Sequence, residues 1–184
     1  MTTPMVPREI RKIHEGRVFT LQVETIPLPA GGELTADVIR HPGSVALIPV
    51  TDAGEIVLVQ QYRVPLGRST WELPAGTLKP GEDPERAAVR ECHEEIGLIP
   101  ANLLRLGAFF PTPGYCDELM TFYLATALRE PDPEDEAARQ DEDEDIEARA
   151  FPRETLRQMI ASGEIVDLKT VAGLSLARMV DGGP

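Results

Sequence analysis

The sequence has little cysteine and no long apolar run. Its two cysteines, Cys92 and Cys116, form no Cys-x-x-Cys pair, which argues against a disulfide scaffold or a zinc site and favours a reducing compartment. No stretch approaches the ~20 apolar residues of a membrane span, and residues 1–11 lack the apolar core of a signal peptide. We therefore expect a cytoplasmic protein with no membrane partner.

Basic residues are also scarce, since 18 Lys and Arg stand against 31 Asp and Glu. Much of the acidic excess lies in residues 130–147, where eleven residues are acidic and only Arg139 is basic. The chain has no basic stripe to offset phosphate charge, so we do not expect a nucleic acid partner. The acidic segment repels itself and has nothing to build a core, and we expect it to form a mobile loop.

The remaining chain alternates between strand and helix patterns within the length of one domain. Helices are expected from Asp83 and over residues 152–162 and 167–179. Strands are expected over the segments that are rich in apolar and β-branched residues: 17–26, 34–41, 45–50, 56–62, 104–110, 119–127 and 146–151. Strands flanked by a few helices predict an α+β fold with an α/β/α sandwich.

The clearest helix should begin at Asp83 and end at Gly97. Asp83 is a good N-cap, Pro84 suits the first helical position, and Gly97 suits the C-terminal stop. An apolar stripe along this helix can be buried, and it consists of Ala88, Cys92 and Ile96, with Val89 beside it. The helix can therefore pack on one face and present polar groups at the edge of a cleft.

Three glutamates of this helix, Glu91, Glu94 and Glu95, are spaced so that they share one face. Clustered carboxylates repel one another unless cations neutralise them, and carboxylate oxygens are the ligands that Mg²⁺ and Mn²⁺ prefer. Arg90 should pair with Glu94, one helical turn away, and orient it without itself binding the metal. The alternative, for such a pattern in isolation, is an acidic helix face in contact with solvent.

The context of the three glutamates favours the metal site. Residues 76–98 read GTLKPGEDPERAAVRECHEEIGL, and the segment resembles the Nudix signature at every fixed position. Those positions are Gly76, Glu82, Arg90, Glu91, Glu94, Glu95, Gly97 and Leu98, with Cys92 as the small apolar residue.

The resemblance implies a Nudix fold, in which a mixed sheet lies between helices, and hydrolysis of a diphosphate with the help of divalent cations. By position in the signature, Glu91 and Glu95 are the expected principal metal ligands, with Glu94 assisting and Arg90 contributing to catalysis. The carbonyl group of Ala75, directly before the signature glycine, is the expected backbone ligand.

Similarity to the bacterial ADP-ribose pyrophosphatases extends beyond the signature. It includes Gln60–Arg63, Trp71–Gly76 and a Pro-Gly-x-x-x-Glu run that begins at Pro113. Arg63 is the expected cation for the diphosphate, because its guanidinium group can bind phosphate oxygens in a fork. The other residues expected to bind substrate in this resemblance are Glu72, Gly114, Tyr115 and Glu118.

The general base in that subgroup comes from a loop glutamate rather than from the signature helix. Aligning the subgroup on Asp145-Ile146 places this glutamate at Glu142, with Glu144 as the alternative. The substrate implied by the resemblance is a nucleoside diphosphate sugar, with ADP-ribose cleaved to AMP and ribose 5-phosphate as the first expectation.

Two other functions remain open. One is hydrolysis of GDP-mannose or another nucleotide sugar, and the other is a nucleotide-binding Nudix module without catalysis, which the complete set of glutamates argues against. The strands before residue 41 lack a core of their own, so we expect residues 1–41 to form an arm and residues 42–184 to form the hydrolase domain. The resembling enzymes imply a homodimer that exchanges these N-terminal strands.

Overall fold

The computed structural model describes residues 5–133, 135 and 146–181. Within these ranges the chain forms two compact units. The first unit comprises the described residues up to residue 43 together with residues 109–119, and the second comprises residues 44–108 and the described residues from residue 120 onwards. The proposed base Glu142 and its alternative Glu144 lie outside the described residues.

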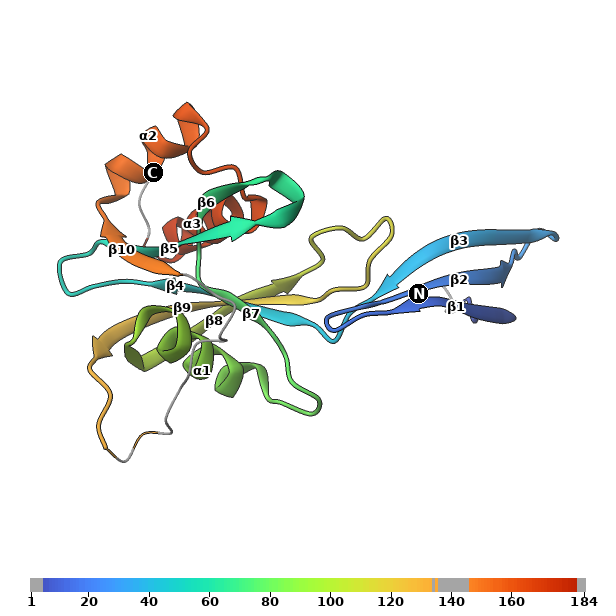
Figure 1. Cartoon of the computed structure of the whole chain (residues 1–184), viewed down its shortest axis with the longest axis horizontal. Coiled ribbons are helices and arrows are strands. Elements are labelled where there is room, and N and C mark those ends of the chain that lie inside the picture. The colour runs from blue at the N-terminus through green and yellow to red at the C-terminus, as the bar shows by residue number, and fades with distance from the viewer. Residues whose placement is uncertain (1–4, 134, 136–145, 182–184) are drawn as a thin grey trace. The chain divides into compact units, whose positions relative to one another are not determined.

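The first unit is built on an antiparallel sheet in the order β1 (Glu9–Glu15), β2 (Thr20–Pro27) and β3 (Glu33–Arg40) (Figure 1). A turn at residues 29–32 joins β2 to β3, and Gly31 and Gly32 both have positive φ there, as such a turn requires. β1 was not expected, because its side chains are all exposed and carry no apolar pattern. Pairing with β2 provides its hydrogen bonds.

The segment that carries the Pro-Gly-x-x-x-Glu run belongs to this same unit. Ile39 at the end of β3 donates its N–H to the carbonyl of Tyr115 (2.7 Å), and Asp117 donates its N–H to the carbonyl of Ile39 (3.2 Å). Arg40 then bridges two carboxylates, donating to Glu24 through Nε (2.9 Å) and to Asp117 through Nη1 (2.9 Å). The strands and the residue 109–119 segment therefore form one body. A domain boundary at residue 41 stays a prediction.

The second unit contains two further sheets. One is mixed, in the order β7 (Ala75–Thr77), β4 (Ser44–Pro49), β9 (Met120–Arg129) and β8 (Ile99–Phe109), with β4 and β9 parallel. The other is antiparallel, in the order β10 (Glu147–Phe151), β5 (Ile56–Arg63) and β6 (Arg68–Glu72). A 3-10 turn, η1 (Val64–Leu66), joins β5 to β6.

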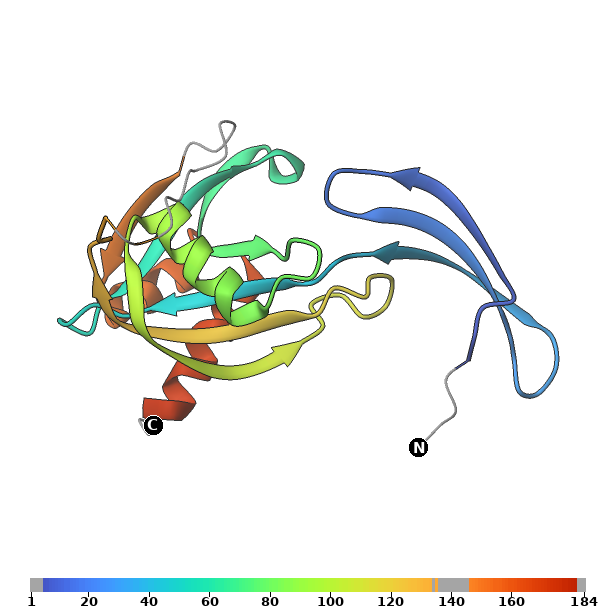
Figure 2. The same ribbon diagram turned by 90° about the horizontal axis from the view of Figure 1, so that it is seen from below.

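Helices lie on both sides of β4. The helix α1 (Pro84–Ile96) packs against β4 and β7, and α3 (Leu168–Asp181) packs against β4 from the other side (Figure 1). Figure 2 shows α1 lying across the face of the mixed sheet. The short helix α2 (Arg153–Ser162) follows β10. This arrangement confirms the predicted α+β fold with a mixed sheet between helices.

The side chains of β4 explain why this strand is apolar without interruption. Ala46 and Ile48 belong to the core shared with α2 and α3, whereas Val45 and Leu47 belong to the core shared with α1. Successive side chains of a strand point to opposite faces, so a strand with a core on each face is apolar at every position. The side chains on one face of β4 thereby hold α1 against the sheet.

Most expected elements are present with shifted ends, and three strands, β1, β6 and β7, were not expected. β6 and β7 follow the 3-10 turn. β6 forms a hairpin with β5, the strand before it, whereas β7 pairs with the more distant β4. β8 is longer than the expected strand at residues 104–110. No helix among the described residues has the length and apolar character needed to cross a membrane.

Candidate active site

The helix α1 begins and ends at the residues that the sequence indicates. Asp83 Oδ1 accepts hydrogen bonds from the N–H groups of Glu85 (3.0 Å) and Arg86 (3.3 Å). At the other end, Gly97 adopts a left-handed conformation with φ of 73° and donates its N–H to the carbonyl of His93. The predicted cap and stop are therefore confirmed, and together they fix the two ends of α1.

Of the three candidate metal-binding glutamates on α1, two are buried. Ala88 and Cys92 pack into the core beneath the helix, as the apolar stripe predicts, and neither is exposed. On the neighbouring face Glu91 is 8% exposed and Glu95 is 6% exposed. Burying a carboxylate is costly unless it is paired, so these two side chains need defined partners.

Both buried carboxylates lie against β7. A Cβ atom on residue 76 would lie 1.8 Å from Glu91 Oε1 and 1.9 Å from its Cδ, so only glycine leaves room for this carboxylate. One position earlier, the N–H of Ala75 donates to Glu95 Oε2 at 3.1 Å. The signature glycine is thus explained by close approach of a side chain.

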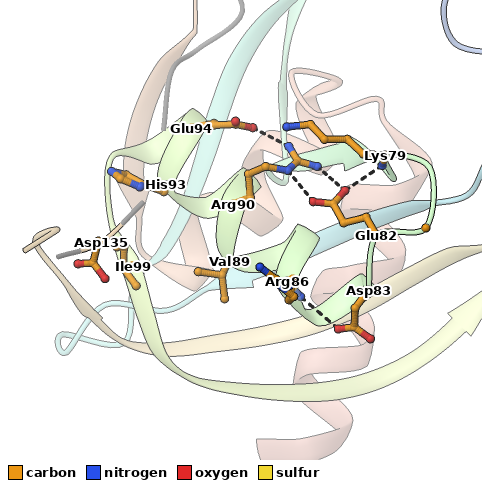
Figure 3. Close-up of a pocket in the computed structure, with 11 residues that line it drawn as sticks. Lys79, Glu82, Asp83, Arg86, Val89, Arg90, His93, Glu94, Ile99 and Asp135 are labelled. Atoms are coloured by element: carbon orange, nitrogen blue, oxygen red, sulfur yellow. Dashed lines mark hydrogen bonds and ion pairs between the residues drawn. The ribbon is translucent and has the colours of Figure 1, made fainter. Parts of the chain in front are cut away.

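The guanidinium group of Arg90 bonds to three carboxylates, of which Figure 3 draws those of Glu82 and Glu94. Its Nε and Nη2 donate to the two oxygens of Glu82 at 2.8 and 2.9 Å. Its Nη1 donates to Glu91 Oε1 and to Glu94 Oε2, both at 2.6 Å. The expected pairing of Arg90 with Glu94 is confirmed, while the bonds to Glu82 and Glu91 were not foreseen.

These contacts keep Arg90 and Glu82 charged. Hydrogen bonding to Glu82 raises the pKa of Arg90 well above its ordinary value, despite the opposing effect of burial. The hydrogen bond from Arg90 lowers the pKa of Glu82. A fixed cation among several carboxylates offsets their mutual repulsion and sets the orientation of Glu91 and Glu94.

The donor set suits hard divalent cations. Glu91, Glu94 and Glu95 present only oxygen atoms, as Mg²⁺ and Mn²⁺ require, and Gly76 leaves a space that the Glu91 carboxylate occupies. In the described part of the chain, however, no three His, Cys, Asp or Glu side chains converge as a ready metal cage. Arg90 and the Ala75 N–H engage these carboxylates instead.

A cavity of about 580 Å³ lies along the outer side of α1 (Figure 3). Arg90, Glu82 and Glu94 form part of its wall. The residues that complete the wall are Lys79, Gly81, Asp83, Arg86, Val89, His93, Ile99 and Asp135. The cavity therefore offers both cationic side chains and carboxylates beside Glu82, Arg90 and Glu94 of the signature.

Arg63 and Glu72 form a second polar group in the same unit, at the ends of β5 and β6. Arg63 donates from Nε to Glu72 Oε1 at 2.9 Å and from Nη2 to Glu72 Oε2 at 2.6 Å. The structure thus brings two expected substrate-binding residues together as a pair. Lys169 donates to both Glu72 and Asp167. Neither Lys169 nor Asp167 was predicted from the sequence to belong to this site, because the sequence there indicated only the start of a helix at Asp167.

Three further residues expected to bind substrate belong to the first unit. Tyr115 is 55% exposed, although its carbonyl group is engaged by Ile39. A Cβ atom on Gly114 would meet nothing within 4 Å, so this glycine is not required by packing within the structure. The N–H of Glu118 donates weakly to Cys116 Sγ at 3.4 Å.

Comparison with known proteins is consistent with this arrangement. A family model described as the NUDIX domain matches residues 40–172. The chain is 37% identical to an ADP-ribose pyrophosphatase of Bacillus subtilis, over 91% of this chain and 89% of that protein. It is also 37% identical to an ADP-ribose pyrophosphatase of Mycobacterium tuberculosis, over 93% of this chain and 82% of that protein.

A less similar relative is named for a different substrate. A GDP-mannose pyrophosphatase of Shigella flexneri is 30% identical over 91% of this chain and 92% of its own length. Among solved structures, a crystal structure of an ADP compounds hydrolase superimposes with a TM-score of 0.81. It covers 97% of this chain and 95% of that chain at 20% sequence identity, which establishes likeness of fold.

Proposed function

This chain belongs to the NUDIX family, and on that premise we propose that it hydrolyses the diphosphate bond of a nucleoside diphosphate sugar. The observation that carries the proposal is the pair of buried carboxylates, Glu91 and Glu95, lying against the backbone of Ala75 and Gly76. The preferred substrate is ADP-ribose, which water would cleave to AMP and ribose 5-phosphate. The names of the similar enzymes support this choice.

Divalent cations, Mg²⁺ or Mn²⁺, would be held by Glu91, Glu94, Glu95 and the carbonyl group of Ala75. When bound, such cations polarise phosphoryl oxygens and neutralise the charge that develops on the diphosphate. Arg90 is held in place by its bonds to Glu82 and would orient Glu91 and Glu94 through its own bonds to them. Arg63, 39% exposed at its side chain, would contact the diphosphate from the end of β5.

A side-by-side panel of substrates tests this proposal. We expect a higher kcat/KM for ADP-ribose than for GDP-mannose or a nucleoside triphosphate, with AMP and ribose 5-phosphate as products. Phosphate-containing products would be separated by chromatography, with Mg²⁺ and Mn²⁺ each supplied in turn. A preparation of the Glu95→Gln variant, purified in parallel, controls for contaminating hydrolases. Preferential release of GMP from GDP-mannose would favour the alternative substrate, and absence of turnover would favour a binding module.

The general base is proposed from the sequence, since Glu142 lies outside the described residues. The attacking water must lose a proton, and glutamates that bind cations are poor bases because the cations hold their lone pairs. We expect Glu142→Gln to lower kcat by about a hundredfold or more while KM and metal affinity stay nearly unchanged. Glu144→Gln and Asp143→Asn are the matched controls. If Glu144→Gln proves the severe variant instead, the general base is Glu144. If neither Glu142→Gln nor Glu144→Gln lowers kcat, the base must be sought among Glu82, Glu94 and Glu118.

A homodimer with exchanged N-terminal strands is the proposed assembly. Several large apolar side chains of the first unit are exposed, including Ile10 (55%), Ile13 (46%) and Leu34 (47%), and their burial against a second copy of the chain would be favourable. Light scattering at micromolar concentration should give twice the mass of the chain. A fully active monomer under those conditions would contradict the proposal.

A further inference from the structure

Lys169 is a nearly buried cation in the first turn of α3. Its side chain is 11% exposed, and its Nζ donates to Asp167 Oδ2 at 2.9 Å and to Glu72 Oε2. Glu72 lies 97 positions earlier in the chain, at the end of β6. The contact therefore ties the start of the last helix to the strand that precedes Ala75.

Helix stability does not account for a lysine at this position. The first turn of a helix carries partial positive charge, so a cation there is unfavourable. A buried ion pair is also no more stabilising, as a rule, than apolar side chains of similar volume. What such a network does supply is a defined geometry for the groups it joins.

Glu72, held by Lys169, in turn binds the guanidinium group of Arg63. Burial of Glu72 opposes its ionisation, but hydrogen bonds from Arg63 and the charge of Lys169 prevail and lower the pKa of Glu72. Its carboxylate is therefore an anion held between two cations, with Arg63 bound through Nε and Nη2. Arg63 and Lys169 both line a cavity of about 340 Å³, which a ligand can approach.

Thr170 secures the same corner of the fold. Its hydroxyl group accepts a hydrogen bond from the N–H of Leu73 at 2.8 Å and donates one to Asp167 Oδ2 at 2.6 Å. Asp167 also caps α3 by accepting the N–H of Thr170 at 3.0 Å. The start of α3 is thus attached to the backbone beside Glu72 as well as to its side chain.

We propose that Lys169 is a positioning residue that, by holding Glu72, aims the guanidinium group of Arg63 at the diphosphate of the substrate. Glu72 then acts as the shared anion between Lys169 and Arg63. This inference rests on the proposed function, because it assigns Arg63 to the diphosphate.

Kinetics of two Lys169 variants test the proposal. Lys169→Met removes the charge at similar length, and we expect KM for ADP-ribose to rise about tenfold while kcat changes less than about threefold. Lys169→Arg should recover most of the loss. Arg157→Met, which removes an exposed cation from α2, is the control and should leave both constants unchanged. Unchanged kinetics in Lys169→Met would overturn the proposal.

A double-mutant cycle separates positioning from general loss of structure. If Lys169 acts through Arg63, then Lys169→Met should change kcat/KM less than about twofold in an Arg63→Ala background. Full additivity of the two losses would contradict the proposal. Lys169→Gln provides a second variant if Lys169→Met does not fold, with the same expected directions.

An NMR measurement without substrate tests the link from Lys169 to Arg63 separately from the proposed function. The side-chain Nε–H signal of Arg63 in a ¹⁵N–¹H spectrum, assigned by its loss in Arg63→Lys, should shift in Lys169→Met and stay in place in Arg157→Met. An unmoved signal would overturn the positioning role even in an active enzyme. If the wild-type protein hydrolyses no nucleotide sugar but the signal moves, the proposed function fails and the link from Lys169 to Arg63 stands.

Discussion

Glu95→Gln and Glu91→Gln are each expected to lower kcat by about three orders of magnitude, because each removes a charged ligand of a cation that stabilises the transition state. Such a loss corresponds to ~4 kcal/mol in the activation free energy. Glutamine has the size of glutamate, and at residue 95 its side-chain oxygen can still accept the N–H of Ala75. The fold should therefore survive a change that removes the charge.

Steady-state kinetics at a fixed concentration of Mg²⁺ or Mn²⁺ provides the measurement. Glu85→Gln is the matched control, since it makes the same substitution on an exposed residue in the first turn of α1. Thermal unfolding of all three variants would show whether the helix remains packed. Turnover close to that of the wild type in Glu91→Gln or Glu95→Gln would remove that residue from the metal site.

Gly76→Ala is expected to lower kcat by about a hundredfold or more, although it adds only one methyl group. The new Cβ atom would lie 1.8 Å from Glu91 Oε1, whereas nonbonded atoms rest at about 3.5–4.0 Å. The carboxylate of Glu91 must therefore leave its place against β7. Because the end of a glutamate side chain can rotate, we expect a smaller effect on thermal stability than on activity.

A combined variant shows whether Gly76 acts through Glu91. Adding Gly76→Ala to Glu91→Gln should reduce kcat little further, since the group that the methyl displaces is already disabled. Losses that multiply in the double variant would mean that the glycine serves another purpose, such as the approach of substrate to the backbone. Wild-type activity in Gly76→Ala would mean that catalysis does not need the Glu91 carboxylate in its place against β7.

The helix α1 shows how far local signals reach. Its cap at Asp83, its stop at Gly97 and the bond between Arg90 and Glu94 all join residues within about one helical turn, so their geometry follows from helix repeat alone. The second partner of Arg90, Glu82, lies eight positions earlier in the preceding loop. Helix geometry does not place a loop residue, and this bond was not foreseen.

Strand composition likewise predicts only part of the sheets. β4 and the first half of β5 were expected, because a strand buried on both faces is apolar at successive positions. β1 and β7 were not, since one is fully exposed and the other has three residues. Both exist because a neighbouring strand supplies hydrogen-bond partners, and that pairing depends on how the whole chain folds.

The sequence by itself determined the family resemblance, the carboxylate chemistry of α1 and the class of reaction, because the signature lies within 23 consecutive residues. Tertiary structure alone decided the contacts between residues far apart in the chain. Only the fold places Asp117 beside Arg40, 77 positions away, and Lys169 beside Glu72, 97 positions away. The physical reason is that charge pairing acts through space: a sequence shows which side chains carry charge, and packing selects the partners that they meet.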